Sequence, residues 1–232
     1  TPALAMDIRY IDSGLYGMNF IRELTPALSL HGKVGYNDVD HVMDNYSLRP
    51  LTAPMAMRAP SDTSTWGLRG HVELGRTNPI LIGVTVESAD ADATRFAGPN
   101  PEMVNMKQSV LWADVTNTQA GAFFEGTVAI GSSTQIVYGA RVDHFTSEAA
   151  RADEKTLGGN GPAPRQLWIS YTGNGDDSWS TTDFGGLARI EHRFGSWQLF
   201  GGLSRTVRPA DATERYLGAN SSMPPMRWIG NP

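Results

Sequence analysis

The sequence predicts an all-β protein, namely an antiparallel, up-and-down segment of a transmembrane β-barrel with about nine strands. Three observations support this fold class. Apolar and polar residues alternate with period two in several segments, short and long connections alternate along the chain, and no segment has the periodicity of a long amphipathic helix. Since successive side chains of a strand point to opposite faces, each such segment has one apolar and one polar face.

The alternation is clearest at residues 28–37 (LSLHGKVGYN), 136–143 (IVYGARVD) and 184–193 (FGGLARIEHR). Weaker versions occur at 80–87 and 122–130. In a membrane barrel, lipid-facing apolar residues alternate with polar residues that face the lumen, which is the pattern seen in these segments. In 28–37 the odd positions carry the polar side chains, so we expect the odd positions to face the lumen.

The connections between these strands alternate strictly in length. Short turns are expected near 24–26, 77–79, 131–133 and 195–196, and long polar loops near 44–62, 91–116, 146–180 and 208–232. A meander with short turns on one rim and long loops on the other gives this order, as in outer-membrane barrels. A soluble β-sandwich with Greek-key links is not expected to alternate so regularly.

The composition excludes several other classes of protein. The chain has 232 residues, which suggests one domain or a piece of a larger one, and a net charge of −5, which argues against a nucleic-acid binder. It has no cysteine, so neither a disulfide framework nor a cysteine-based zinc site forms within it. It also contains no apolar run of ~18 residues, and its first residues lack a basic n-region and an apolar core, so we expect neither a transmembrane helix nor a signal peptide. Motifs of serine hydrolases, zinc proteases and phosphate-binding loops are absent, so we expect no enzyme.

Methionine is concentrated at the expected long-loop rim. From Met43 onward, seven methionines lie in or beside the long loops: Met43, Met55, Met57, Met103, Met106, Met223 and Met226. Methionine normally fills cores, so packing alone explains this placement poorly. Thioether ligands select soft ions, above all Cu(I).

His41 and Met43 form the strongest candidate metal site, in the stretch HVMDNYSLRP. Two residues apart, they share a face of a strand, and the odd-position parity turns both toward the lumen near the extracellular mouth, provided no bulge intervenes. Two ligands do not complete a site for a metal that prefers three or four, so an ordinary strand end is the competing interpretation. The loop methionines could equally be packing residues.

The remaining histidines and the acidic pairs have plainer interpretations. We expect His31 to face the lumen in solvent, and the other three histidines to be structural because none has a partner at ligand spacing; they are His71, His144 and His192. Asp38 and Asp40 fall on the apolar-face parity but beyond Tyr36, so they would stand above the membrane while Tyr36 joins an aromatic girdle. Asp176 and Asp177 are expected to be solvated.

Three stretches resemble a known family. YNDVDHVMDNYSLRP (36–50) is similar to the TonB-dependent outer-membrane copper receptors, and SRTVRPADATERYLGANSSMPPMRWIGNP (204–232) and GAFFEGTVAIGSSTQIVYGARVDHF (121–145) resemble TonB-dependent receptors in general. The resemblance implies a barrel of roughly 22 strands with a plugged lumen. It also implies import across the bacterial outer membrane, in contact with its lipid and energised through the TonB complex.

On this resemblance, residues 1–232 are a partial barrel domain, without the plug domain and the C-terminal strands. In the copper branch, a His-x-Met on the barrel wall joins a Cys-x-x-x-Met from the plug to bind copper, and His41 and Met43 match the wall half. Copper is then the transported ligand. Met55, Met57, Met103 and Met106 would be accessory residues along its path, holding it weakly and passing it inward.

Two other functions remain open at the level of sequence. The chain could belong to a receptor of the same architecture for an iron–siderophore or another metal chelate, which would use aromatic and arginine side chains of the loops. Those available are Arg95, Trp168, Tyr171 and Trp228. Alternatively, the chain could be a soluble β-rich binding module, which would require its apolar strand faces to form one packed core.

Overall fold

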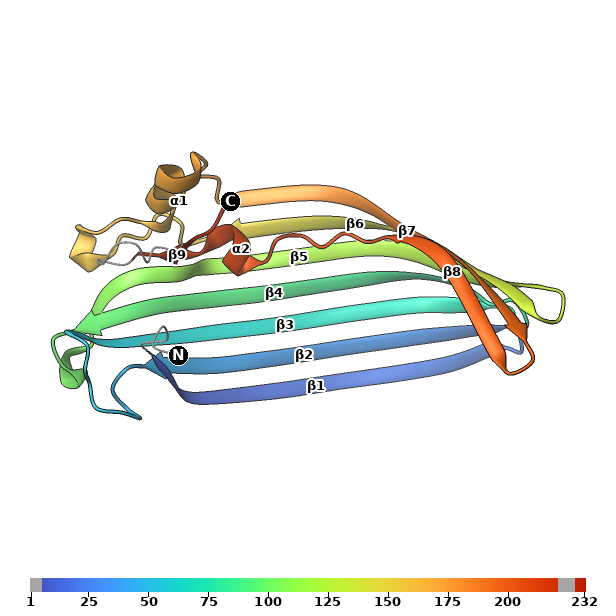
Figure 1. Cartoon of the computed structure of the whole chain (residues 1–232), viewed down its shortest axis with the longest axis horizontal. Coiled ribbons are helices and arrows are strands. Elements are labelled where there is room, and N and C mark those ends of the chain that lie inside the picture. Colours follow the sequence, from blue (N-terminus) through green and yellow to red (C-terminus); the bar gives the residue numbers. More distant parts are fainter. Residues whose placement is uncertain (1–5, 221–227) are drawn as a thin grey trace.

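Eight long antiparallel strands form one sheet in chain order, so that each strand is hydrogen-bonded to the strands before and after it (Figure 1). The structure is a computed structural model, and it describes residues 6–220 and 228–232. The strands are β1 (Asp7–Thr25), β2 (Leu28–Asp44), β3 (Ala56–Leu74), β4 (Ile80–Gly98), β5 (Met106–Ile130), β6 (Thr134–Ala149), β7 (Ser178–Phe194) and β8 (Trp197–Arg205). The up-and-down topology is confirmed, with eight strands in this sheet rather than about nine.

The connections alternate between the two ends of the sheet. All four expected short turns are confirmed at one end, and the long loops lie at the other. Two loops are shorter than expected, because the strands continue: the β2–β3 loop is 45–55 and the β4–β5 loop is 99–105. A membrane strand needs only ~9–11 residues, so strands of 17 to 25 residues at β2 to β5 extend well beyond a bilayer. The parts of the strands that extend toward the long loops carry polar side chains on both faces, so their sequence predicts loops.

The long loops contain the short elements, which the sequence did not predict. These are η1 (Pro101–Met103), η2 (Leu157–Gly159), α1 (Pro164–Thr172), α2 (Ala212–Tyr216), β9 (Gly218–Ala219) and β10 (Trp228–Ile229). The helix α1 begins with Pro164, whose fixed φ suits a first helical position, and ends at Gly173, whose φ of 79° suits glycine. No helix among the described residues is long and apolar enough to cross a membrane.

The two faces of the sheet differ sharply in chemistry. On the face that we call outer, cross-strand rows are apolar, and one of them joins Leu30, Val72, Ile82 and Phe124. These side chains are not covered by a second layer: Ile82 is 50% exposed and Phe184 66%. Apolar surface on this scale marks contact with lipid or a partner. The opposite, inner face carries polar rows, such as Lys33, Arg69 and Thr85, as a lumen wall would.

An aromatic row crosses the outer face where the apolar band ends toward the long loops. Tyr16, Tyr36 and Trp66 are neighbours across β1, β2 and β3, and the rings of Tyr16 and Tyr36 stack with centroids 6.4 Å apart. Beyond this row the same face becomes acidic, with Asp40 opposite Asp62. This order is that of a membrane girdle followed by solvent. It also places Tyr36 in the girdle position that the sequence predicts.

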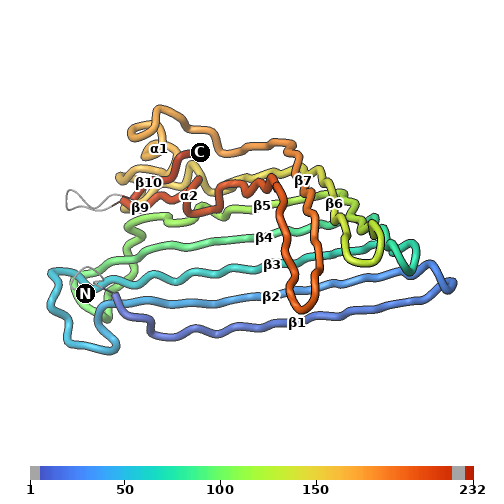
Figure 2. Tube along the Cα trace, turned by 45° about the vertical axis from the view of Figure 1, so that its right-hand side comes forward, coloured from blue at the N-terminus to red at the C-terminus, as the bar shows by residue number. Residues whose placement is uncertain are grey.

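The tightly packed core lies in the long loops and not between layers of the sheet. Residues of the β6–β7 loop and of the segment after β8 pack on the long-loop half of β5, and together we call them the cap. Trp168 of α1 and Tyr216 of α2 are fully buried there, with ring centroids 5.3 Å apart. Figure 1 shows the cap at the long-loop end, and in the view of Figure 2 the β7–β8 hairpin bends down in front of β3 and β2.

Candidate functional site

His41 and Met43 lie near the long-loop end of β2. The pairing of β2 with β3 runs from Leu28 to Asp44 without a register shift, and the bulge at this end belongs to β1, between Ile8 and Tyr10. No bulge in β2 therefore separates His41 from the polar positions of the inner face. Both side chains share that face, as strand alternation requires.

His41 occupies a row with small neighbours. The row continues through Ser61 of β3 to Ala93 of β4. The Ser61 hydroxyl lies 3.5 Å from His41 Nδ1, and it donates to the His41 carbonyl oxygen at 3.3 Å. On the other side of the ring, His41 Nε2 is buried and has no hydrogen-bond partner among the described residues. Buried polar atoms are rarely left unpaired, so this nitrogen needs an explanation.

Met57 lies on the same face as His41 and Met43. Met43 is opposite Ala59, and Met57 lies two residues before Ala59 on β3, which makes Met57 a diagonal neighbour of Met43. Asn45 fixes the start of β3, because its side chain accepts from Met57 N at 2.8 Å and donates to the Met55 carbonyl at 3.0 Å. The β2–β3 loop is thereby closed close to the candidate site.

A second methionine reaches the same level of the inner face from β5. Ala97 pairs with Met57 on one side and with Met106 on the other. Two strand spacings, roughly 10 Å, therefore separate the backbones of Met57 and Met106, with only the small, fully buried Ala97 between them. Met103 lies nearby in η1, where 52% of it is exposed.

The described residues do not form a complete metal centre. Nowhere between 6 and 220, or in 228–232, do three or more histidine, cysteine, aspartate or glutamate side chains gather as ligands. The donors brought together at the rim are one imidazole and several thioethers. Met223 and Met226 lie outside the described residues.

Part of the cap, the segment after β8, reaches the face that carries the candidate site. Arg95, two residues from Ala93 on β4, belongs to the inner face, and its Nη2 donates to the carbonyl oxygen of Asn220 and to Ser109 Oγ. Ser109 Oγ also donates to that carbonyl at 2.8 Å and accepts from Asn220 N at 3.1 Å. These bonds attach the segment after β8 to the wall beside the row of His41.

Within the cap, Arg165 of α1 holds the long β6–β7 loop together. Its guanidinium pairs with Asp153 at 2.8 Å and with Asp177 at 2.5 Å. The two carboxylates, Asp153 first and then Asp177, raise the pKa of Arg165 above its usual value. Asp177 is 44% exposed, as a solvated residue would be, and it is also an ion-pair partner, which the sequence did not predict.

Two of the four residues proposed for a siderophore are already engaged in the structure. Trp168 is fully buried in the cap core, where its Nε1 donates to the Leu217 carbonyl at 3.2 Å. The prediction that Trp168 is available to a ligand was therefore wrong. Trp228 is 64% exposed on β10 and Tyr171 is 51% exposed on α1, while Arg95 is engaged with Asn220.

His71 has a stacking partner that its spacing in the sequence does not show. His71 of β3 is directly opposite His31 of β2, and the two rings stack with centroids 4.5 Å apart and planes 7° apart. The long β2–β3 loop hides this register from the sequence, because the pairing of two strands cannot be counted across a loop of unknown length. His144 and His192 do behave as structural residues, bonded to Thr182 and Thr134.

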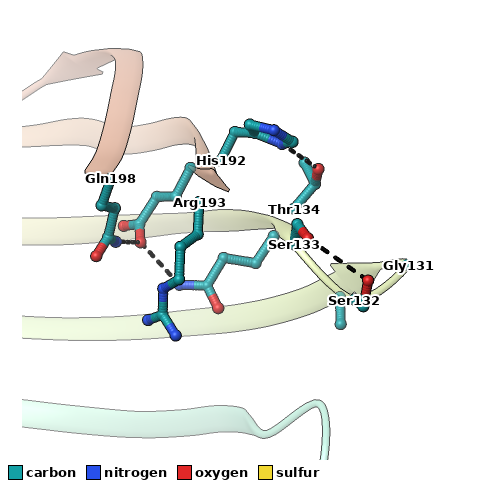
Figure 3. Close-up of a pocket in the computed structure, with 10 residues that line it drawn as sticks. Gly131, Ser132, Ser133, Thr134, His192, Arg193 and Gln198 are labelled. Carbon is teal, nitrogen blue, oxygen red and sulfur yellow. Dashed lines mark hydrogen bonds between the residues drawn. The ribbon is translucent and has the colours of Figure 1, made fainter. Parts of the chain in front are cut away.

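A polar pocket lies at the short-turn end, between the β5–β6 turn and the β7–β8 hairpin (Figure 3). Glu191 is its centre and accepts from the side-chain amides of Gln135 and Gln198, each at 2.8 Å. Arg189 pairs with Glu191 at 2.5 Å. Since its hydrogen-bonding groups are already satisfied by each other, this cluster ties the strands together and offers little to a ligand.

The comparisons with known proteins identify the architecture. The family model "TonB dependent receptor-like, beta-barrel" matches residues 5–232. Among solved structures, the copper transporter OprC is similar, with a TM-score of 0.71 and 21% sequence identity over 91% of this chain. The match covers 32% of OprC, so the chain spans about a third of that protein's length. No curated protein sequence matches the chain.

Proposed function

Because the chain belongs to the TonB-dependent receptor β-barrel family, we propose that it forms part of the wall of an outer-membrane receptor that binds and imports copper. Members of this family are receptors and transporters of the outer membrane, and not enzymes. In this proposal, the polar inner face lines the lumen, the apolar outer face meets lipid, and uptake is energised by the TonB complex through a plug domain.

The buried, unpaired Nε2 of His41 is the observation that carries the copper assignment. Leaving a buried acceptor or donor unpaired costs ~1–3 kcal/mol, and coordination of a metal ion would offset that cost. The Met43 thioether, on the same face two residues away, supplies a soft second ligand, which favours Cu(I) over harder ions. The structural similarity to a copper transporter supports the same assignment at the level of the fold.

Methionines at the rim supply the accessory path. Met57 and Met106 flank Ala97 on the inner face, and Met55 and Met103 belong to the two adjoining loops. Neutral thioethers alone bind weakly, so an ion held by them would be released inward toward His41 and Met43. Replacing all four by leucine should slow copper uptake by the whole receptor; unchanged uptake would remove these residues from the path.

The direct test compares Cu(I) affinity in the purified whole receptor by competition with a chromophoric chelator. His41→Ala and Met43→Leu should each weaken binding by about tenfold or more, since a ligand contributes at least as much as the groups that orient it. His144→Ala is the matched control, because His144 lies on the outer face and contacts Thr182. Wild-type affinity in both His41→Ala and Met43→Leu would refute the assignment.

A further inference from the structure

A shallow apolar groove crosses the outer face of the sheet within the apolar band. Its volume is about 910 Å³, which lies in the range of roughly 300–1,000 Å³ that is typical of sites for small molecules. Small residues of two neighbouring outer rows form the depression, namely Gly70, Ala122 and Ala140. Bulkier side chains such as Ile82 and Phe124 stand beside them and form its walls.

The floor of the groove is backbone, because the residues between these two rows turn the other way. His71, Gly83 and Phe123 also line the groove, but they belong to an inner row. On the inner face the rings of His71 and Phe123 pack with centroids 6.4 Å apart, so neither ring reaches the groove. Arg141, of the same inner row, is paired with Asp143 at 2.5 Å. The side chains that the groove presents to a ligand are therefore apolar.

One cation stands at the edge of the groove. Arg22 of β1 pairs with Leu30 of β2, which lines the groove, so Arg22 extends the same outer row. Arg22 is exposed, and its guanidinium forms no ion pair within the part of the chain that the structure describes. Arg205, at the other end of this row on β8, lies 3.7 Å from Asp183. Arg22 is thus the end of the row that is free to bind an anion.

Arg22 lies near the depth of lipid headgroups on the short-turn side. From Tyr16, in the aromatic row, to Thr25, where β1 ends, the strand has about the ~9–11 residues that cross a bilayer. Arg22 comes three residues before Thr25, close to the short-turn end of this span. A long arginine side chain lays its apolar stem along the surface and extends its charged group to water, so the guanidinium reaches the interface.

We propose that Arg22 and the groove bind one anionic phospholipid of the leaflet on the short-turn side. The headgroup phosphate accepts two parallel hydrogen bonds from the guanidinium, and an acyl chain lies in the groove. The net negative charge of the lipid selects it over a zwitterionic lipid, whose phosphate is balanced by its own ammonium group. The inference rests on the part of the proposed function that places the outer face in lipid, and it does not depend on copper.

The test is native mass spectrometry of the purified whole receptor, with phosphatidylglycerol or phosphatidylcholine added to the detergent. The wild type should retain phosphatidylglycerol about fivefold more strongly, since one basic residue near a membrane surface favours anionic lipid by roughly that factor. Arg22→Gln should remove this preference. Lys33→Gln is the matched control, because Lys33 carries the same charge on β2 but faces the lumen.

A second variant tests the groove separately from the charge. Ala122→Phe fills the depression and should weaken retention of phosphatidylglycerol by about fivefold or more. Val128→Phe adds the same ring to the outer face of β5 away from the groove, so it should leave retention unchanged.

The outcomes separate this site from the rest of the account. Equal retention of the two lipids by the wild type would overturn the proposal, and so would an unchanged preference in Arg22→Gln or an effect of Lys33→Gln as large. Unchanged retention in Ala122→Phe would overturn it as well. Each of these results would leave copper import standing, whereas a receptor that retains no lipid would also contradict the assignment of the outer face to lipid.

Discussion

Single residues on the inner face decide which side chains meet. Gly83 is the clearest case, because it stands between His71 and Phe123 in one row of the sheet. A Cβ at this position would meet the Gly70 carbonyl oxygen and would approach Phe123 Cζ to 2.7 Å. Both the close strand contact and the support of His71 by Phe123 therefore depend on the absence of a side chain.

Gly83→Ala should lower the free energy of unfolding by about 1–3 kcal/mol, the usual cost of inserting a methyl group into a filled space. Urea unfolding of the receptor refolded into lipid vesicles measures this change. Gly35→Ala is the matched control, since its Cβ would lie 3.7 Å from the Tyr16 carbonyl oxygen, at an ordinary contact distance. Equal stabilities of the two variants would contradict the account.

At the scale of elements, α2 is held to its loop by an ion pair as well as by packing. The Arg208 guanidinium binds both carboxylate oxygens of Glu214, at 2.8 and 2.9 Å, and Glu214 also accepts from Asp211 N. Arg208 first, and then the Asp211 amide, lower the pKa of Glu214 to about 2. A lowered carboxyl pKa means that the stabilisation is fully present above the ordinary value near 4.5 and is lost as the pH falls toward 2.

We therefore expect the Glu214 side-chain carboxyl carbon to titrate with a midpoint near 2 in an NMR pH series. In Arg208→Ala the midpoint should return toward 4.5, the ordinary value. The control is Asp153 in the β6–β7 loop, because its pKa is lowered by Arg165 and should not change in Arg208→Ala. A wild-type midpoint near 4.5 would show that this ion pair does not form.

The strands could be predicted from sequence where one face is apolar and the other polar, because the period-two pattern is then visible in the sequence. Beyond the Tyr36 row this alternation is lost, so the sequence predicts loops where β3 begins at Ala56 and where β4 continues to Gly98. The helix α1 was missed since its burial depends on the cap around Trp168, which forms only in three dimensions.

The candidate site, too, could be predicted from sequence only in part. Strand alternation is local, so the shared face of His41 and Met43 follows from a spacing of two residues. Which residues lie opposite depends on register, which is set by the whole pairing of β2 with β3. The diagonal position of Met57 and the stack of His31 on His71 both depend on this register. Neither can be read from the spacing of residues in the sequence.

At the scale of the whole molecule, one sheet separates two environments. The outer face is an exposed apolar band bounded by the aromatic row of Tyr16, Tyr36 and Trp66, and the inner face carries charge and the candidate metal ligands. A soluble module would bury that band in one core, whereas the core of this chain lies in the cap around Trp168 and Tyr216. The arrangement is that of a barrel wall.

Substitutions at two neighbouring positions of β4 test which face of the sheet is apolar and which is the polar inner face. Ile82→Arg places a charge on the outer face, which should cost ~2–4 kcal/mol at the bilayer midplane. Leu81→Arg places the same charge on the inner face between Glu73 and Glu125, where it should cost little. Urea unfolding in lipid vesicles measures both variants. A greater loss of stability in Leu81→Arg would reverse the assignment of the two faces.

The most direct test of the central claim is anomalous X-ray diffraction at the copper edge, on crystals of the whole receptor grown with copper under reducing conditions. We predict an anomalous peak within bonding distance of His41 Nε2 and Met43 Sδ, on the inner face of β2. A copper-loaded receptor without a peak at these two atoms would contradict the claim that they are the wall's copper ligands.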